Sequence, residues 1–141
     1  MSRQDVLKMA IRSNPCEIHH VEKRLENFLR AAGLSRDEIE NIGIAVTEVV
    51  NNAIQHGNKN DQSKKVYLEF SRLQDRIEIR IQDVGGGFDP ASVADPLQPE
   101  NILKESGRGI FIVKALMDQV RYSFSEKGTT VELVKFLHSN G

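Results

Sequence analysis

Apolar residues recur along this chain with two different periods, and each period predicts one kind of element. A run with helical spacing of three and four residues predicts an amphipathic helix that ends at Gly33. That run comprises Ile18, Val21, Leu25, Phe28 and Leu29. A second run with the same spacing predicts a helix over about 36–56, because Ser35 and Glu38 form a capping-box pattern before it and Gly57 follows it.

Strict alternation of apolar and polar residues predicts strands near 7–11, 66–70, 77–81, 120–124 and 131–137. An alternating strand keeps one polar face, whereas strands of a doubly wound parallel sheet are apolar on both faces. The pattern therefore favours an α/β (α+β) two-layer sandwich. We expect a mixed, largely antiparallel sheet with helices on one face.

The periodicity disappears between residues 88 and 106, where three of the four prolines, Pro90, Pro96 and Pro99, are found. An irregular segment of 19 residues is typical of a lid or a binding loop. The length of 141 residues matches one ordinary domain. We expect a single domain over 1–141 with a lid at about 88–106.

Charge and cysteine content exclude several function classes. The chain has 19 Lys+Arg, 20 Asp+Glu and a net charge of -1, so no diffuse positive field favours direct nucleic-acid binding. Cys16 is the single cysteine, which suits a reducing cytoplasm, and the longest apolar stretch, 110–113, is too short to cross a membrane. The histidines do not follow a zinc-site spacing. They are His19, His20, His56 and His138.

Glu48 and Asn52 lie one turn apart in the second predicted helix, on a stripe beside its apolar face. A carboxylate can orient or deprotonate a hydroxyl group. An amide oxygen can occupy one position of a Mg²⁺ ion that phosphates and water otherwise hold. The alternative is an ordinary solvated helix face.

Asp83 directly follows an apolar strand and precedes three glycines at 85–87. Residues without Cβ let the main chain approach a flat or charged ligand closely. An ionised Asp only accepts hydrogen bonds, so it would favour the amino group of adenine over the carbonyl group of guanine. The alternative is a turn that requires positive φ.

Gly107, Arg108 and Gly109 open a further apolar helix, whose free N–H groups could receive phosphate oxygens. The alternative is a plain helix start. Neither a Walker A motif nor a complete G-x-G-x-x-G occurs in the sequence, which disfavours P-loop and Rossmann chemistry.

Four segments together resemble the ATP-binding boxes of the Bergerat-fold (GHKL, HATPase) ATPases, in the same order. They are Glu48–Gly57, Asp83–Phe88, Ser106–Val113 and Lys127–Thr130. The resemblance covers residues 7–137. Because the chain is compact and lacks a dimerisation helix with a phosphoacceptor histidine, it looks like the stand-alone anti-sigma factor serine/threonine kinases of bacterial partner-switching systems.

This resemblance implies roles for individual residues. Glu48 would be the base acting on the acceptor serine, Asn52 would coordinate Mg²⁺, and Asp83 would bind the adenine amino group with Thr130 supporting it. The implied nucleotide-binding set is Asn52, His56, Asp83, Gly85, Gly87, Gly107, Arg108, Gly109, Ile110 and Thr130.

The other members of that set have simpler implied roles. Gly85 and Gly87 would shape the adenine pocket, while Gly107 and Gly109 would hold phosphates under the lid. For Arg108, phosphate contact, partner contact and solvation all stay open. His56 would stack near the nucleotide, with a helix cap or a solvated position as the alternative.

The resemblance also implies a function. The chain would use ATP and Mg²⁺ to phosphorylate a serine of a STAS-type anti-sigma-antagonist, would sequester a sigma factor and would form a homodimer. One alternative is a nucleotide-gated protein-binding module with little or no kinase turnover. Another is a kinase in a regulatory assembly without a sigma factor.

Overall fold

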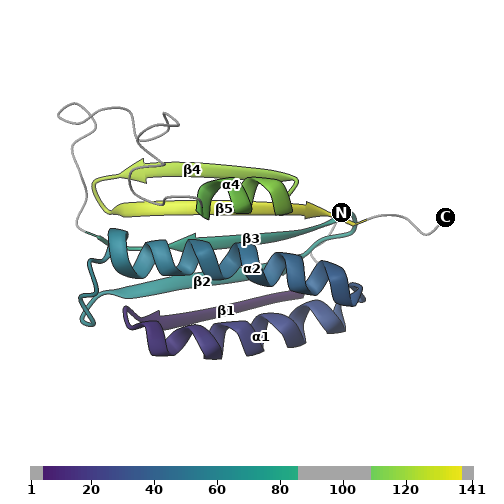
Figure 1. The fold of residues 1–141 in the computed structure, drawn as a ribbon, viewed down its shortest axis with the longest axis horizontal. Helices are drawn as coiled ribbons and strands as arrows, with labels where there is room; N and C mark the ends of the chain where they lie inside the picture. The colour runs from purple at the N-terminus through teal and green to yellow at the C-terminus, as the bar shows by residue number, and fades with distance from the viewer. Residues whose placement is uncertain (1–4, 86–108, 138–141) are drawn as a thin grey trace.

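The computed structural model describes residues 5–85 and 109–137, which form two layers (Figure 1). A five-stranded sheet has the order β1-β2-β3-β5-β4, and all its described pairings are antiparallel. Helices cover one face of it, so the predicted fold class is confirmed. The strands are β1 (Asp5–Arg12), β2 (Lys65–Arg72), β3 (Arg76–Gln82), β4 (Gln119–Ser125) and β5 (Gly128–Phe136). The helices are η1 (Pro15–Glu17), α1 (Ile18–Ala31), α2 (Arg36–Asn52), η2 (Ala53–Gly57) and α4 (Gly109–Leu116).

The predicted helix over 36–56 is present, but its last turn changes type. The capping box at its start is complete, because Ser35 Oγ accepts from the Glu38 N–H and the Glu38 side chain accepts from the Ser35 N–H. The α-helical pattern ends at Asn52, and Ala53–Gly57 form a π-helical turn, η2. Turns of this kind are often found at functional sites.

The core lies between the helices and the inward face of the sheet. Alternate residues of every strand point toward α1, α2 or α4, as the period of two requires. Phe70, Ile79 and Leu133 illustrate this, since they are neighbours on adjacent strands and all are buried. In Figure 1, α2 crosses the middle of the sheet with α1 on one side and α4 on the other.

The opposite face of the sheet has a row of alternating charges across all five strands. The register places side by side Lys8, Glu69, Arg80, Glu132 and Arg121. Arg80 Nη2 lies 3.3 Å from Glu132 Oε2. Opposite charges on directly paired residues favour this register, and a shift by one residue would turn charged side chains into the core.

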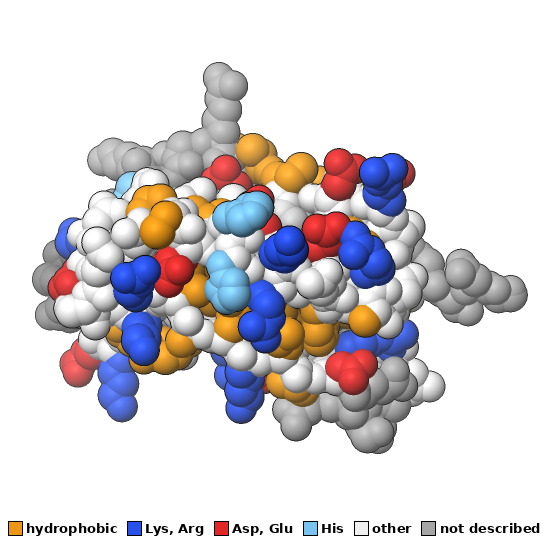
Figure 2. All heavy atoms as spheres, turned by 90° about the horizontal axis from the view of Figure 1, so that it is seen from below, with side chains coloured by type: hydrophobic (Ala, Val, Ile, Leu, Met, Phe, Trp, Pro, Cys, Tyr) orange, Lys and Arg blue, Asp and Glu red, His pale blue; other side chains and the backbone are white. Residues whose placement is uncertain are grey.

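The outer surface of α1 is polar. Figure 2, which looks at the molecule from below, shows basic, acidic and histidine side chains interspersed over this face. His19, His20 and Cys16 are all exposed near the start of α1. None of the helices within 5–85 and 109–137 is both long and apolar enough to cross a membrane.

Candidate functional site

Asp83 lies just beyond the end of β3 and is only 5% exposed. Its Oδ1 accepts two backbone hydrogen bonds at 3.1 Å, one from the Gly85 N–H and one from the Thr129 N–H. The Asp83 N–H in turn donates to Thr129 O at 3.0 Å. These bonds fix the orientation of the Asp83 carboxylate just after the end of β3, the central strand of the sheet.

Three glycines from three separate segments surround Asp83. A Cβ at position 57 would lie 2.1 Å from Asp83 Oδ2, and one at position 85 would lie 1.8 Å from Gly57 O. Gly128 has a φ of +134°, and its Cβ would lie 2.1 Å from Asp83 O. Real side chains do not tolerate such distances, so glycine is required at each position for the segments to meet around the carboxylate.

Burial raises the pKa of Asp83, although the hydrogen bonds from Gly85 and Thr129 and the positive charge of Lys64 lower it in part. Within the described residues only Oδ1 receives hydrogen bonds, so Oδ2 keeps its capacity to accept. An ionised carboxylate in this position can accept a hydrogen bond from an exocyclic amino group such as that of adenine.

The structure places Thr129, rather than the predicted Thr130, against Asp83. Thr130 pairs with Gln82 on β3 and with Ser123 on β4, so it belongs to the opposite face of the sheet. Because successive strand residues alternate between faces, only one of two adjacent threonines can lie on the same face as Asp83.

Glu48 and Asn52 are half-buried residues one turn apart on α2. Asn52 is the last residue of α2, so it directly precedes η2, and Gly57 at the end of η2 contacts Asp83. The structure thereby brings the predicted helix site and the predicted base site to the same end of the sheet. His56 is exposed within η2.

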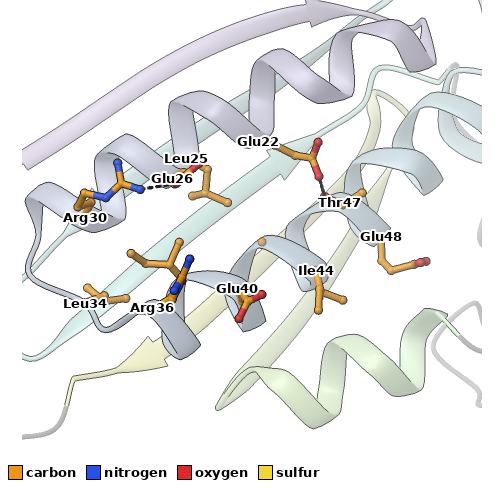
Figure 3. A pocket seen from close by; sticks show the side chains of 12 residues that line it. Glu22, Leu25, Glu26, Arg30, Leu34, Arg36, Glu40, Ile44, Thr47 and Glu48 are labelled. Carbon is orange, nitrogen blue, oxygen red and sulfur yellow. Dashed lines mark hydrogen bonds and ion pairs between the residues drawn. The ribbon is translucent and has the colours of Figure 1, made fainter.

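A groove of about 840 Å³ is lined by residues of both α1 and α2, and Glu48 lies at one end of it (Figure 3). Near this end Thr47 Oγ1 donates to Glu22 Oε2 across the groove at 3.5 Å. Apolar side chains such as Leu25 and Ile44 also line the groove. A protein segment that entered it would therefore reach Glu48.

Several predicted site residues lie outside the described residues. They are Gly87, Gly107, Arg108 and the lid at 88–106. Gly109 and Ile110 form the first residues of α4.

The residues around Asp83 and Asn52 fit ATP with a divalent cation. Among the described residues, no cluster of three or more His, Cys, Asp or Glu could hold a metal ion. An amide oxygen such as that of Asn52 is a donor type that Mg²⁺ accepts, and Mg²⁺ commonly takes few protein ligands beside phosphate oxygens and water.

Comparison with known proteins identifies the family. The profile of the histidine kinase-like ATPase domain matches residues 11–135. The chain belongs to this family. Its predicted membership of the GHKL ATPases is thus confirmed, and membership implies the use of ATP.

Two similar proteins of this family are bacterial kinases. One is the serine-protein kinase RsbW of Staphylococcus epidermidis, which is 35% identical over 96% of this chain and 89% of its own length. The other is the serine-protein kinase RsbW of Bacillus licheniformis, which is 34% identical over 95% of this chain and 87% of its own length. These names agree with the predicted enzyme class, a serine protein kinase.

Solved structures support the fold. The RsbU and RsbW domains of Rv1364c from Mycobacterium tuberculosis match with a TM-score of 0.70 at 18% identity, over 94% of this chain and 33% of that one. The mycobacterial sensor histidine kinase MprB matches with a TM-score of 0.53 at 17% identity, over 92% of this chain and 97% of that one.

Three residues that build the site of this ATPase domain had no predicted role there. Gly57 and Gly128 lie within two of the four segments that resemble ATP-binding boxes, but no role at Asp83 was predicted for either of them, although both contact it. Asn58 is 1% exposed and hydrogen-bonds the backbone next to Asp83. No sequence pattern identified it, because an asparagine after a helix-ending glycine is ordinary turn chemistry.

Proposed function

We propose that this chain is an ATP-dependent serine protein kinase and anti-sigma factor of a bacterial partner-switching system. It phosphorylates a STAS-type anti-sigma-antagonist and sequesters a sigma factor. The observation that carries the proposal is the buried Asp83 carboxylate, enclosed by Gly57, Gly85 and Gly128, at the end of the helix that holds Glu48 and Asn52. The names of the RsbW relatives support the choice of serine as acceptor.

Each site residue has a separate task in this proposal. Asp83 accepts a hydrogen bond from the adenine amino group and so selects ATP. Asn52 contributes an amide oxygen to Mg²⁺, which neutralises phosphate charge when bound. Glu48 accepts the proton of the acceptor serine as its hydroxyl oxygen attacks the γ-phosphorus, while the bond from that phosphorus to the bridging oxygen of ADP breaks.

The phosphorylated acceptor explains how partners exchange. A phosphoserine adds roughly -1.5 to -2 charges. Placed near the half-buried Glu48 and near Glu22 and Glu40 in the groove, this charge would be repelled. The phosphorylated antagonist then leaves, and the kinase is free to hold the sigma factor as a homodimer in the cytoplasm.

The test is incubation of the purified protein with ATP, Mg²⁺ and candidate partners from the same cell extract. Intact mass identifies the polypeptide that gains one phosphate, and fragmentation identifies the modified residue. A single phosphoserine on a STAS-type protein supports the proposal. ATP-dependent binding of that protein without phosphate transfer would instead establish a nucleotide-gated binding module.

A sigma factor recovered with the kinase in the presence of ATP supports the anti-sigma role. Phosphate transfer to the STAS-type protein without any bound sigma factor would place the kinase in a sigma-independent assembly. Adding the unphosphorylated antagonist provides the control, because it should displace the sigma factor and its phosphorylated form should not.

A further inference from the structure

Asn58 joins three segments through its side chain while being only 1% exposed. Its Oδ1 accepts from the Val84 N–H at 2.9 Å. Its Nδ2 donates to Ser13 Oγ at 2.8 Å and to Lys65 O at 3.1 Å. The carboxamide is therefore held on both sides, with its oxygen toward the Asp83 loop and its nitrogen toward the end of β1 and the start of β2.

Ser13 continues this network behind Asn58. It is 1% exposed, follows the last residue of β1, and its Oγ donates to Lys64 O just before β2. The donors and acceptors of the two side chains match their surroundings, because Val84 N can only donate whereas Lys64 O and Lys65 O can only accept. A buried network in which each of these groups has a partner is rigid.

The backbone of Asn58 is tied to the other half of the site. Its N–H donates to Ala53 O at 2.8 Å, which closes the π-helical turn that follows Asn52. Its side chain meanwhile holds the residue next to Asp83. One residue thus connects the helix of Glu48 and Asn52 to the loop of Asp83.

We propose that Asn58 is a positioning residue that sets the nucleotide-base selectivity of this kinase by holding the Val84 backbone and thereby the Asp83 carboxylate. The inference rests on the proposed use of ATP at this site. Asn58 contacts the backbone of Val84, next to Asp83, and touches no substrate atom in this proposal.

Neither aspartate nor alanine satisfies all three contacts of Asn58. Aspartate is nearly the same shape, but its ionised carboxylate cannot donate to Lys65 O and would be repelled by it. Alanine would leave the Val84 N–H without its partner in a buried site, and an unmade buried hydrogen bond is strongly unfavourable. Either change frees the Val84 backbone to move, and Asp83 moves with it.

The experiment compares the dissociation constants of ATP and purine riboside triphosphate, which has hydrogen in place of the adenine amino group. Wild type should prefer ATP. In Asn58→Ala and Asn58→Asp we expect ATP binding to weaken by about tenfold, whereas the analogue should change by less than about twofold, because it makes no amino contact with Asp83. Asn27→Ala, at an exposed asparagine of α1, is the matched control.

Ser13→Ala provides a second variant that keeps Asn58 and its bond to Val84, and removes the two hydrogen bonds of Ser13 Oγ, one from Asn58 Nδ2 and one to Lys64 O. Ser13→Ala should also lower the preference for ATP over the analogue, by a smaller factor than the Asn58 variants. If the Asn58 variants do not fold, the ratio of the two dissociation constants in Ser13→Ala tests the proposal. Melting temperatures establish that each variant compared is folded.

Two results would overturn the positioning role. One is an unchanged ratio of the two dissociation constants in the folded variants. The other is equal weakening of both nucleotides, which would indicate general structural support. Failure of the wild type to transfer phosphate would count against the proposed function only, since the base preference is measured by binding alone.

Discussion

Gly57 and Asp83 touch although they belong to different segments, the first at the end of η2 and the second after β3. The space between them is so small that a Cβ on residue 57 would stand 2.1 Å from Asp83 Oδ2. A substitution at the end of η2 therefore also affects the position of Asp83 in the loop after β3.

Gly57→Ala should disturb both stability and nucleotide binding. The added methyl group must displace the Asp83 side chain, and overpacking of this kind costs about 1–3 kcal/mol of unfolding free energy. We expect a lower melting temperature and weaker ATP binding by calorimetry. Gly43→Ala in α2 is the control, since among the described residues a Cβ there meets no atom within 4 Å outside its own helix backbone and chain neighbours. That change should stabilise the helix by about 0.5–1 kcal/mol, and Gly57→Ala behaving in the same way would contradict the packing argument.

Asp83→Asn should separate binding from stability. The variant loses the acceptor-only group, so ATP affinity should fall by about tenfold or more. Its melting temperature near neutral pH should be no lower than that of wild type, because an ionised buried carboxylate is removed. Full ATP affinity in Asp83→Asn would contradict the assigned contact between Asp83 and the adenine amino group.

The pH dependence of wild type provides an independent check on Asp83. Burial raises the pKa of Asp83 above the ordinary 3.8, so the folded protein binds this proton more tightly than the unfolded chain does. The contribution of Asp83 to the free energy of unfolding is present below 3.8 and is lost as pH rises through the folded pKa. ATP binding has the opposite dependence, because the contact needs the ionised group. Both dependences should be weaker in Asp83→Asn, as measured by melting and by titration with ATP.

Glu48→Gln should abolish most phosphate transfer while leaving nucleotide binding nearly intact. Loss of a positioned base costs about 10²–10⁴ in rate, whereas glutamine keeps the size of the side chain. The measurement is phosphate incorporation into the acceptor beside an ATP titration. Glu69→Gln changes a carboxylate on the opposite face of the sheet and should transfer phosphate at the wild-type rate. Normal transfer by Glu48→Gln would remove Glu48 from the mechanism.

Asn52→Ala should lose most of the gain in ATP affinity that Mg²⁺ provides. The amide oxygen of Asn52 is the protein ligand proposed for the ion. The measurement is ATP affinity with Mg²⁺ and with a chelator present. Asn51→Ala is the matched control, because this half-buried neighbour lies about 100° further back around α2. Equal Mg²⁺ dependence in both variants would argue that the ion binds without Asn52.

The predicted elements came from local patterns that survive folding. Alternation located the five strands, because one face of each strand packs on helices and the other faces solvent. The Ser35–Glu38 capping box was readable because both of its hydrogen bonds are local. Helical spacing likewise placed Glu48 and Asn52 on one stripe of the helix, whereas their roles at a site were implied by the resemblance to the GHKL ATPases.

The sequence by itself determined the elements, their polar and apolar faces, and the residue types able to recognise a nucleotide, since each of these depends on neighbours within a few positions. Only the tertiary structure decided which residues meet. It put Thr129 rather than Thr130 beside Asp83, gathered Gly57, Gly85 and Gly128 around that carboxylate, and gave Asn58 its partners. The physical reason is that strand register and close packing join segments far apart in the chain, and no local pattern carries that information.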